Sequence, residues 1–271
     1  IEDKKILVSG GAGSIGSELI RQLIPHNRVY IVDNNETCFF DLYEELKQKG
    51  YDISGKIGDI RDRKTFDDIP TPDIIFHAAA LKHVAPSEWN PLEYVKTNIF
   101  GTDNVIDFAQ KSGAKLINIS TDKVANGESI MALTKKIAER MVRNAGFVSV
   151  RFGNVLGSKG SVIPFWQGQL DRNESLTITD EKMKRYFMTI PEAVKLIIKA
   201  TEIGEPGQIM IMDMGESKSV YELALDILKK SGKEGLGIKK IGIRPGESLE
   251  EKLMSDEEAG RAIKKDNFWV L

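Results

Sequence analysis

Short segments rich in β-branched residues alternate with helical segments through the first half of the chain, and this alternation restricts the fold more than any other feature. Segments with strand character are residues 5–9, 28–33, 56–60, 74–79, 115–120 and 147–153. The intervening stretches, such as 14–24 and 93–112, carry apolar residues at helical spacing. Strands that alternate with helices are joined by right-handed crossovers, which place helices on both faces of a parallel sheet. We therefore predict a doubly wound α/β fold.

The pattern changes after about residue 153. Glycine, serine and proline cluster in GNVLGSKGSVIP, residues 153–164, and shorter elements follow. A chain of 271 residues is long enough for one α/β domain and a smaller lobe. We predict that residues 1–153 form the sheet domain. Residues 154–271 should form a smaller C-terminal lobe that is interleaved with the last strands of the sheet.

The charge balance argues against nucleic acid and membrane partners. The chain has 38 Lys and Arg against 40 Asp and Glu, and no long run of one sign, so it lacks a basic patch for nucleic acid or anionic lipid. The chain has no run of 18 apolar residues, so we expect no segment of it to cross a membrane. The single cysteine, Cys38, cannot form an internal disulfide, so we expect a cytoplasmic protein, and we expect no metal site. The chain begins directly at a strand, as a piece of a longer protein would.

The segment SGGAGSIGSE, residues 9–18, follows the first predicted strand and opens the first helix. Its glycines Gly10, Gly13 and Gly16 permit a tight turn and a close approach of the backbone to a pyrophosphate, which the helix N-terminus then faces. The same spacing also occurs in simple tight turns. In this context it predicts a Rossmann-type dinucleotide-binding sheet, with the smaller lobe binding the substrate.

Acidic residues after the next two strands support a dinucleotide site. Asp33 ends the second strand, 17 residues after Gly16, where a carboxylate accepts hydrogen bonds from the adenosine ribose. The alternative for Asp33 is an Asx turn with Asn34. Because a carboxylate repels a 2′-phosphate and residues 33–36 contain no Arg, NAD is favoured over NADP. Asp59 and Ile60 are expected either to flank the adenine or to cap a loop.

A hydroxyl, a carboxylate and an ammonium group stand side by side after the fifth strand, at Thr121, Asp122 and Lys123. Lys135 follows twelve residues after Lys123, and Met131 stands four residues before Lys135. An isolated Thr-Asp-Lys after a strand is usually a surface turn. Shortly before a helix that carries a lysine, on a dinucleotide-binding fold, it indicates a catalytic site.

Seven motifs occur in an order that resembles the extended short-chain dehydrogenase/reductase superfamily. They are GGAGSIGSEL (10–19), HAAALKHV (77–84), NPLEYVKTNIFGT (90–102), STDK (120–123), RFGNVLGSKGSVIP (151–164), RYFMTIPEA (185–193) and IRPGESLEEKL (243–253). More closely, the chain resembles nucleotide-sugar 4,6-dehydratases of polysaccharide biosynthesis, which act on UDP-N-acetylglucosamine. MALTK, residues 131–135, is similar to the branch with methionine in place of a tyrosine. That branch is typically the catalytic part of larger membrane-anchored proteins and is associated with retention at C5.

The resemblance implies an NAD-dependent lyase that forms a UDP-4-keto-6-deoxy-N-acetylhexosamine by C4 oxidation, loss of water across C5 and C6, and hydride return to C6. Lys123 is then the C5 base, Asp122 the acid for the C6 oxygen and Thr121 a partner of the C4 oxygen. Lys135 holds the nicotinamide ribose. Met131 carries no proton, so the C4 proton passes to Thr121 and water, to Asp122, or to Lys135 through a water. We favour a relay that begins at Thr121. The alternative is that Met131 is core packing in a site that has lost its activity, but the intact Thr121, Asp122 and Lys123 argue against such a loss.

The resemblance also assigns binding residues. For the cofactor these are, besides those above, Ser14, Ile15, Ala78, Ala79 and Lys82. For the substrate they are Lys82, His83, Met131, Asn154, Ser161, Arg185, Arg244 and Glu247. For His83 a structural role is an equal alternative. A surface salt bridge or a loop cap is the alternative for the other five, which are Asn154, Ser161, Arg185, Arg244 and Glu247. Asn98, within a predicted helix, is expected to give structural support through its backbone contacts.

Two other functions stay open. A UDP-sugar 4-epimerase on the same fold returns hydride to the other face of C4, but it has no use for Asp122 and Lys123 and ordinarily relies on the missing tyrosine. A non-catalytic NAD-binding subunit is supported only by Met131. The family has Asn-Pro where this chain has Asn126-Gly127, and the glycine loosens a loop expected to seat the acetamido group. Superfamily members assemble through helices packed side by side, so we expect a homo-oligomer.

Overall fold

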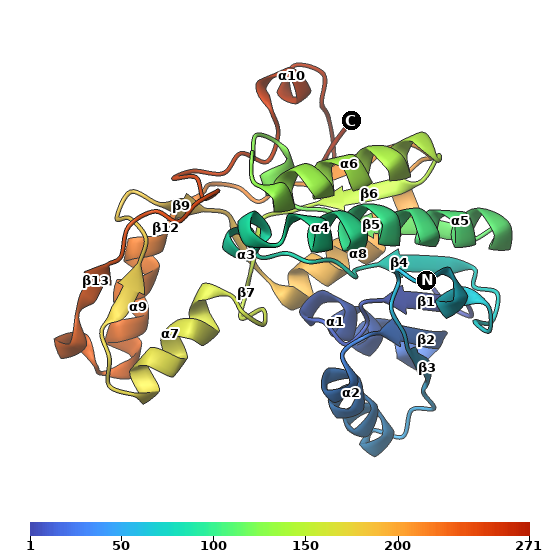
Figure 1. Cartoon of the computed structure of the whole chain (residues 1–271), viewed down its shortest axis with the longest axis horizontal. Coiled ribbons are helices and arrows are strands. Elements are labelled where there is room, and N and C mark those ends of the chain that lie inside the picture. Colours follow the sequence, from blue (N-terminus) through green and yellow to red (C-terminus); the bar gives the residue numbers. More distant parts are fainter.

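A nine-stranded sheet forms the centre of the larger part of the molecule, in a computed structural model that describes residues 1–271 (Figure 1). Its strand order is β14-β15-β11-β6-β5-β4-β1-β2-β3. Seven strands are parallel, and the hairpin of β14 and β15 pairs antiparallel with β11. The strands are β1 Lys5–Ser9, β2 Arg28–Asp33, β3 Ser54–Ile57, β4 Ile74–His77, β5 Lys115–Ile119, β6 Val148–Arg151, β11 Ile209–Met212, β14 Ile263–Lys265 and β15 Phe268–Val270.

Helices cover both faces of this sheet, because alternate strand residues point to opposite sides. On β1, Ile6 and Val8 pack with one set of helices, whereas Leu7 packs with the other. The first set is α1 (Ser14–Leu23), α2 (Glu36–Gln48) and α8 (Ile190–Ile203), and the second is α5 (Thr102–Ser112) and α6 (Ile130–Asn144). Ile6, Leu7 and Val8 are fully buried, and each of these side chains stabilises the fold by about 1.5–3 kcal/mol. The doubly wound fold predicted from the sequence is confirmed.

The connection from β4 to α5 is helical but irregular. It comprises α3 (Val84–Trp89), α4 (Pro91–Tyr94) and a π-helical segment η3 (Val95–Gly101) that runs into α5. Short 3₁₀ turns elsewhere are η1 Ile24–His26, η2 Arg63–Phe66, η4 Asp122–Val124 and η5 Glu234–Leu236. None of the helices combines the length and the apolar character that crossing a bilayer requires.

Four of the six predicted strands have different bounds in the structure, and of these β5 ends one residue early, at Ile119. β3 ends at Ile57 and not at residue 60, because Ile57 pairs with Asp33, the last residue of β2. β4 stops at His77, two residues early, because the chain then turns past the backbone of Gly10. β6 covers Val148–Arg151 only, although residues 147–153 share its apolar pattern.

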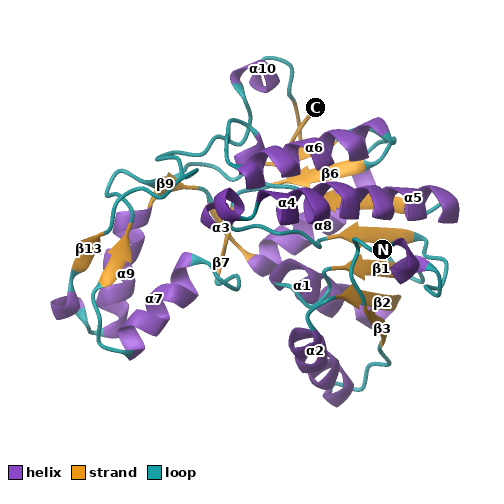
Figure 2. Cartoon of the chain, in the orientation of Figure 1, coloured by secondary structure: helices purple, strands orange, loops and turns teal.

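The smaller lobe lies beside the large sheet, at the left of Figures 1 and 2. Helices α7 (Val162–Asp171) and α9 (Val220–Ser231) pack there on the parallel pair β8 (Leu176–Ile178) and β13 (Ile238–Lys240). Trp166 is fully buried among them and its indole N–H donates to the Thr177 carbonyl at 2.7 Å. The remaining elements are the strand pairs β7 (Asn154–Leu156) with β10 (Phe187–Thr189) and β9 (Lys184–Arg185) with β12 (Lys218–Ser219), and helix α10 (Asp256–Ala259).

Candidate active site

The glycine-rich turn joins β1 to α1 in the tight form that the sequence predicts. Gly10 has φ +69°, and a Cβ there would lie 2.5 Å from the Ala79 nitrogen. A Cβ on Gly16 would lie 2.2 Å from the Gly10 oxygen, so the helix packs directly on the turn. Gly13 precedes α1, and no side chain caps this helix. Its first N–H groups are therefore available to an anion.

A cavity of about 510 Å³ opens beside this turn, at the carboxyl ends of the parallel strands. Asp33 lines it and is held by two backbone donors, Ala12 N–H and Asn35 N–H, each at 2.9 Å. The Asn35 contact is an Asx turn, so the alternative suggested for Asp33 coexists with its position in the cavity. Other predicted cofactor residues in the lining are Gly10, Gly13, Asp59, Ile60, Ala78 and Ala79. Ser14 and Ile15, in the first turn of α1, are not among the lining residues.

Asp59 caps its own loop, one of the two alternatives for this residue, and it also lies in the lining of the cavity. It lines the cavity, and its carboxylate also accepts hydrogen bonds from Arg61 Nε at 2.8 Å and from the Arg61 backbone N–H at 2.9 Å. The Arg61 guanidinium lowers the pKa of this carboxyl group. The Ile60 side chain is buried against Gly101, where an added Cβ would lie only 2.6 Å from Ile60 Cδ1. The volume of the cavity, the glycine-rich turn and the Asp33 carboxylate together fit the adenosine diphosphate half of a dinucleotide.

The Thr-Asp-Lys cluster follows β5, with Thr121 at the N-cap of η4 and Asp122 and Lys123 as its first two residues. The Thr121 hydroxyl donates to Asp122 Oδ1 at 2.9 Å, and Lys123 Nζ donates to the same oxygen at 3.0 Å. Lys123 Nζ also donates to Asn154 Oδ1 at 3.2 Å, which brings a predicted substrate residue of the second half to the cluster. Asp122 is fully buried, yet its Oδ2 has no hydrogen-bond partner. A buried carboxylate oxygen without a donor is rare in folded proteins, and this one marks Asp122 as a candidate functional residue.

Lys135 and Met131 lie one turn apart on α6, and both are buried. Lys135 Nζ donates to the Ile119 carbonyl at 2.5 Å, at the end of β5 and next to the cluster. Burial lowers the pKa of Lys135 to about 8, although the nearby Glu139 carboxylate raises it. Met131 is 2% exposed, as a packed core residue is.

His77, which the sequence analysis did not single out, lies at the end of β4 and is fully buried. Its Nδ1 is 2.8 Å from the Ser9 hydroxyl and its Nε2 is 2.9 Å from the Thr102 hydroxyl. Because Thr102 donates its own proton to the Asn98 carbonyl, it accepts from Nε2–H, and Ser9 donates to Nδ1. Burial, assisted by the charge of Lys135, lowers the pKa of His77 to about 3, so the imidazole is neutral.

Asn98 lies in the π-helical segment and gives the structural support expected of it. Its side chain accepts from Leu81 N–H at 2.9 Å, donates to the Leu81 carbonyl at 3.0 Å and donates to the Thr134 hydroxyl at 3.1 Å. These bonds tie the loop after β4 to α6. They therefore position the loop that carries Lys82 relative to the helix that carries Lys135.

Lys82 and His83 face the second half of the chain. Lys82 Nζ donates to the Lys159 carbonyl at 2.8 Å, and the His83 ring lies against Gly160, where a Cβ would be 2.6 Å from His83 Cε1. Burial lowers the pKa of both side chains, and for His83 the charge of Lys82 adds to the effect. Ser161 caps α7 by position only, since its hydroxyl oxygen is buried without a partner.

Arg185 makes backbone contacts that the sequence did not predict. Its guanidinium donates to the carbonyl oxygens of Lys184, Ser248 and Leu249, and it is 6% exposed. These contacts hold the 248–251 segment in place. The phosphate contact expected of Arg185 stays a prediction.

Arg244 and Glu247 lie on the neighbouring loop, where Arg244 is exposed and Glu247 Oε2 is buried without a partner. A Cβ on Gly246, between them, would lie 3.0 Å from both Ser129 Cβ and Val84 Cγ1. The loop thus packs against the start of α6 and against α3. Nothing brings these two side chains into contact with Thr121, Asp122 or Lys123.

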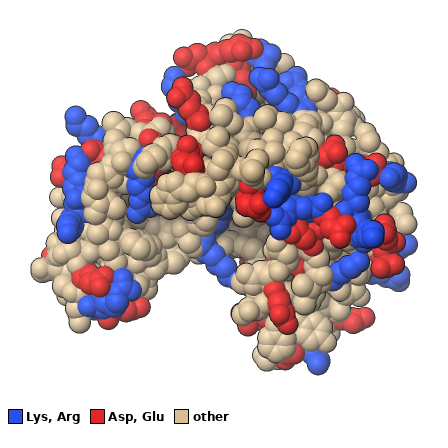
Figure 3. All heavy atoms as spheres, viewed as in Figure 1, with Lys and Arg blue, Asp and Glu red and all other residues tan.

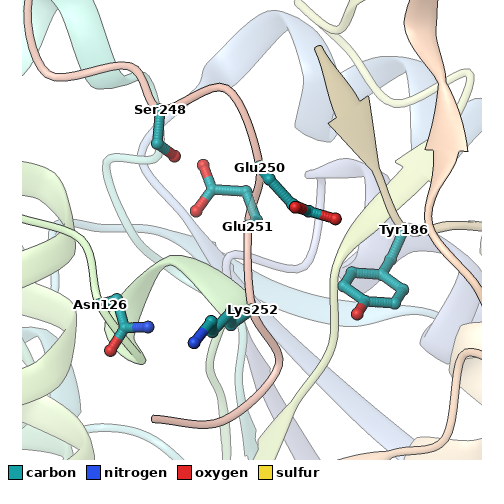
Figure 4. Close-up of a pocket in the computed structure, with 6 residues that line it drawn as sticks. All are labelled: Asn126, Tyr186, Ser248, Glu250, Glu251 and Lys252. Atoms are coloured by element: carbon teal, nitrogen blue, oxygen red, sulfur yellow. The ribbon is translucent and has the colours of Figure 1, made fainter. Parts of the chain in front are cut away.

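A second cavity, of about 370 Å³, was missed by sequence reasoning. Asn126, Tyr186, Ser248, Glu250, Glu251 and Lys252 line it, and the Glu250 carboxylate points toward the Tyr186 ring (Figure 4). A Cβ on Gly153 would lie 2.8 Å from Tyr186 Cβ and 3.0 Å from Asp122 Oδ2, so this cavity borders the catalytic cluster. Burial and the charges of Glu250 and Asp122 raise the pKa of Tyr186. The sequence signals for this cavity were the RYFMTIPEA and IRPGESLEEKL segments and the loop at Asn126.

The strand order, the glycine turn and the Thr-Asp-Lys cluster beside Lys135 define the chain as an extended short-chain dehydrogenase/reductase. The chain belongs to the family described as polysaccharide biosynthesis protein, whose model matches residues 6–271. It is 37% identical to the capsular polysaccharide biosynthesis protein CapD of Staphylococcus aureus over 95% of this chain, and it spans 46% of CapD. The chain thus spans about half the length of that relative.

Other relatives carry names of two activities. The chain is 31% identical to a UDP-N-acetylglucosamine 4,6-dehydratase (inverting) of Campylobacter jejuni, covering 99% of this chain and 82% of that protein. It is 34% identical to a UDP-glucose 4-epimerase of Rickettsia bellii, covering 98% and 82%. The chain is therefore placed among nucleotide-sugar dehydratases and epimerases.

Solved structures agree on the fold. Pen from Bacillus thuringiensis matches with a TM-score of 0.95 and 35% identity, over 100% of this chain and 88% of that one. DesIV from Streptomyces venezuelae, a dTDP-glucose 4,6-dehydratase solved with NAD bound, matches with a TM-score of 0.81 and 22% identity, over 95% and 90%. At that identity the second match supports the fold alone.

Proposed function

We propose that the chain is an NAD-dependent nucleotide-sugar 4,6-dehydratase that converts UDP-N-acetylglucosamine to a UDP-4-keto-6-deoxy-N-acetylhexosamine. The observation that carries this proposal is the buried carboxylate of Asp122, which contacts Thr121 and Lys123 through one oxygen and leaves the other unpaired. Such a cluster offers an acid and a base beside one another. An epimerase, which exchanges only the hydrogen at C4, needs no such pair.

The cavity residues would hold NAD by its adenosine diphosphate half. Gly10 and Gly13 let the backbone and the N-terminus of α1 approach the pyrophosphate, and Asp33 accepts from the ribose hydroxyls. When bound, this cofactor supplies a hydride acceptor for C4 and a hydride donor for C6. Lys135, with its amine held at the Ile119 carbonyl, would orient the nicotinamide ribose.

A proton relay along Thr121 and Asp122 removes the need for a tyrosine at position 131. The C4 hydroxyl gives its proton to Thr121, which passes its own proton to Asp122 Oδ1 along the 2.9 Å hydrogen bond. Asp122, now protonated, gives that proton to the departing C6 hydroxyl, which leaves as water. One proton thus leaves the C4 oxygen and one proton reaches the C6 oxygen, so Thr121 and Asp122 end in their starting protonation states.

Lys123 closes the proton balance at C5. In its neutral form the amine takes the C5 proton, which the C4 ketone makes acidic, and it returns a proton to C5 after hydride reaches C6. Asn154 Oδ1, 3.2 Å from Lys123 Nζ, keeps the amine directed into the site. Asp122 and Lys123 then have the charges with which they began, and only water has left the sugar.

Proton NMR of UDP-N-acetylglucosamine incubated with the protein in deuterated water tests this function. We expect a C6 methyl signal, deuterium at C5 and a 4-keto sugar, and the coupling constants will give the C5 configuration. Asp122→Asn and Lys123→Met should each lower the rate of methyl formation by about 10²–10⁴-fold, the usual contribution of a general acid or base. Lys182→Met, at an exposed lysine outside the cluster, serves as the matched control.

Two results would replace the proposal. Appearance of the C4 epimer without a methyl signal would identify a 4-epimerase, which the 34% identity to the Rickettsia protein makes the second candidate. Binding of NAD without any change in UDP-N-acetylglucosamine or UDP-glucose would identify a binding subunit.

A further inference from the structure

The loop of residues 157–161, between β7 and α7, crosses from the smaller lobe to the mouth of the dinucleotide cavity. Three of its contacts involve Lys159. Its backbone N–H donates to the Ser14 hydroxyl at 2.9 Å, its carbonyl accepts from Lys82 Nζ at 2.8 Å, and its Nζ lies 3.1 Å from Cys38 Sγ. Together these contacts join the start of α1, the loop after β4 and the start of α2.

The next residue extends the crossing. Gly160 has φ +73°, and a Cβ there would overlap the His83 ring at 2.6 Å. This position favours glycine both for its left-handed backbone and for the ring that it faces. The loop is therefore seated across the cavity mouth at four points, and we refer to residues 157–161 as the strap.

The strap brings positive charge that no carboxylate neutralises. Lys159 lines the 510 Å³ cavity together with Gly10, Gly13 and Asp33. Neither Lys159 nor Lys82 forms an ion pair with any carboxylate of the chain. In the space-filling view, Lys or Arg atoms lie in the hollow between the smaller lobe and the rest of the molecule (Figure 3). Two unpaired ammonium groups beside an uncapped helix N-terminus form a site for an anionic diphosphate.

We propose that the strap closes over bound NAD and that Lys159 is a cofactor-binding residue, contacting the pyrophosphate from the smaller lobe. This inference rests on the proposed NAD binding. The diphosphate of the nucleotide sugar has the same chemistry, but the position of the Lys159 ammonium beside Cys38, in the first turn of α2, favours the cofactor. Residues of the smaller lobe thereby contribute to holding the cofactor during the hydride transfers.

Ligand binding to variants at Lys159 tests the proposal without recourse to turnover. NAD⁺ and, separately, UDP are titrated into Lys159→Ala, Lys159→Arg and the wild-type protein by calorimetry, after bound nucleotide is removed. Lys159→Ala should weaken NAD⁺ binding about tenfold, as expected for one charge-assisted phosphate contact, and leave UDP binding within twofold of wild type. Lys159→Arg should restore most of the NAD⁺ affinity. Lys182→Ala, an exposed lysine of the smaller lobe, should bind both ligands as wild type does.

The salt dependence gives a second readout. Loss of a phosphate contact should flatten the dependence of NAD⁺ affinity on salt concentration in Lys159→Ala, whereas a merely structural loop would leave that slope unchanged. Weaker UDP binding with normal NAD⁺ binding would assign the strap to the sugar nucleotide and overturn the proposal. Unchanged binding of both ligands would overturn it as well. If wild-type protein bound no NAD⁺ at all, the proposed function itself would be wrong, which is a different result.

Discussion

Replacing Lys135 by methionine should stabilise the protein without its cofactor, although it removes a catalytic-site residue. The ammonium of Lys135 is buried, and burial lowers its pKa from 10.5 to about 8. At 1.36 kcal/mol per pKa unit, keeping this group charged in the folded protein costs roughly 3 kcal/mol at neutral pH. Methionine has a similar length and no charge. Its loss of the hydrogen bond to Ile119 costs about 1 kcal/mol, so we expect a net gain of about 2 kcal/mol at pH 7.

The stability difference between Lys135→Met and wild type should depend on pH, and the protonation of Lys135 gives the sign of that dependence. Below pH 8 Lys135 is protonated in both the folded and the unfolded protein, and the full cost is present. Between pH 8 and 10.5 the unfolded chain binds more protons than the folded one, so wild-type stability rises with pH relative to the variant. The difference between Lys135→Met and wild type should therefore fall from about 2 kcal/mol at pH 7 to about zero at pH 10.

Urea unfolding of the cofactor-free proteins, followed by circular dichroism at pH 7, 8.5 and 10, measures this difference. Lys182→Met, at an exposed lysine, controls for the loss of a positive charge. A variant that is less stable than wild type at pH 7, with a difference that does not change up to pH 10, would refute the reasoning. It would mean that the buried amine is not charged at neutral pH, or that it stabilises the fold.

Three further outcomes follow from buried contacts and exposed faces. Asn98→Ala leaves Leu81 N–H without its side-chain acceptor, so thermal unfolding should show a stability lower by about 1–3 kcal/mol. The NAD⁺ affinity of this variant should also decrease. Asn98→Asp keeps an acceptor for Leu81 N–H and should recover part of the stability. Because the pKa of His77 is lowered to about 3, folded protein binds fewer protons than unfolded protein below pH 6.5, and roughly 2 kcal/mol of stability should be lost between pH 6.5 and 5. His77→Gln should show a smaller loss over that range in urea unfolding. Phe100, 58% exposed, and Ile137, 45% exposed, lie on η3 and α6, and a Phe100→Asp/Ile137→Asp variant should elute as a monomer in light-scattering chromatography if these helices form the expected homo-oligomer.

Much of the fold and part of the candidate site follow from short-range patterns. The alternation of strand and helix periodicity predicts the parallel sheet, since period-2 and period-3.6 burial are properties of neighbouring residues. The glycine turn is recognisable because the left-handed backbone of Gly10 and the close contact at Gly16 admit no side chain. Thr121, Asp122 and Lys123 are adjacent in the chain, so their mutual hydrogen bonds needed no tertiary information.

Other parts of the site depend on residues that are far apart in the sequence. Arg185 contacts the carbonyls of residues 248 and 249, and the fully buried Arg151 donates both to Glu139 on α6 and to Glu258 on α10. The sequence made Arg185 a candidate for substrate binding and assigned no role to Arg151. Only the packing of the C-terminal segment shows which carbonyl and carboxylate groups these two guanidiniums contact.

The sequence by itself determined the class of fold, the dinucleotide turn and the proximity of Thr121, Asp122 and Lys123, because each is a local arrangement of a few residues. The tertiary structure alone decided that Lys159 lines the cavity beside the glycine turn, that Tyr186 borders Asp122 and that Arg185 contacts the Ser248 carbonyl. These contacts join residues brought together only where the chain crosses between the large sheet and the smaller lobe. Such contacts follow from the packing of whole elements, which no local pattern of residues records.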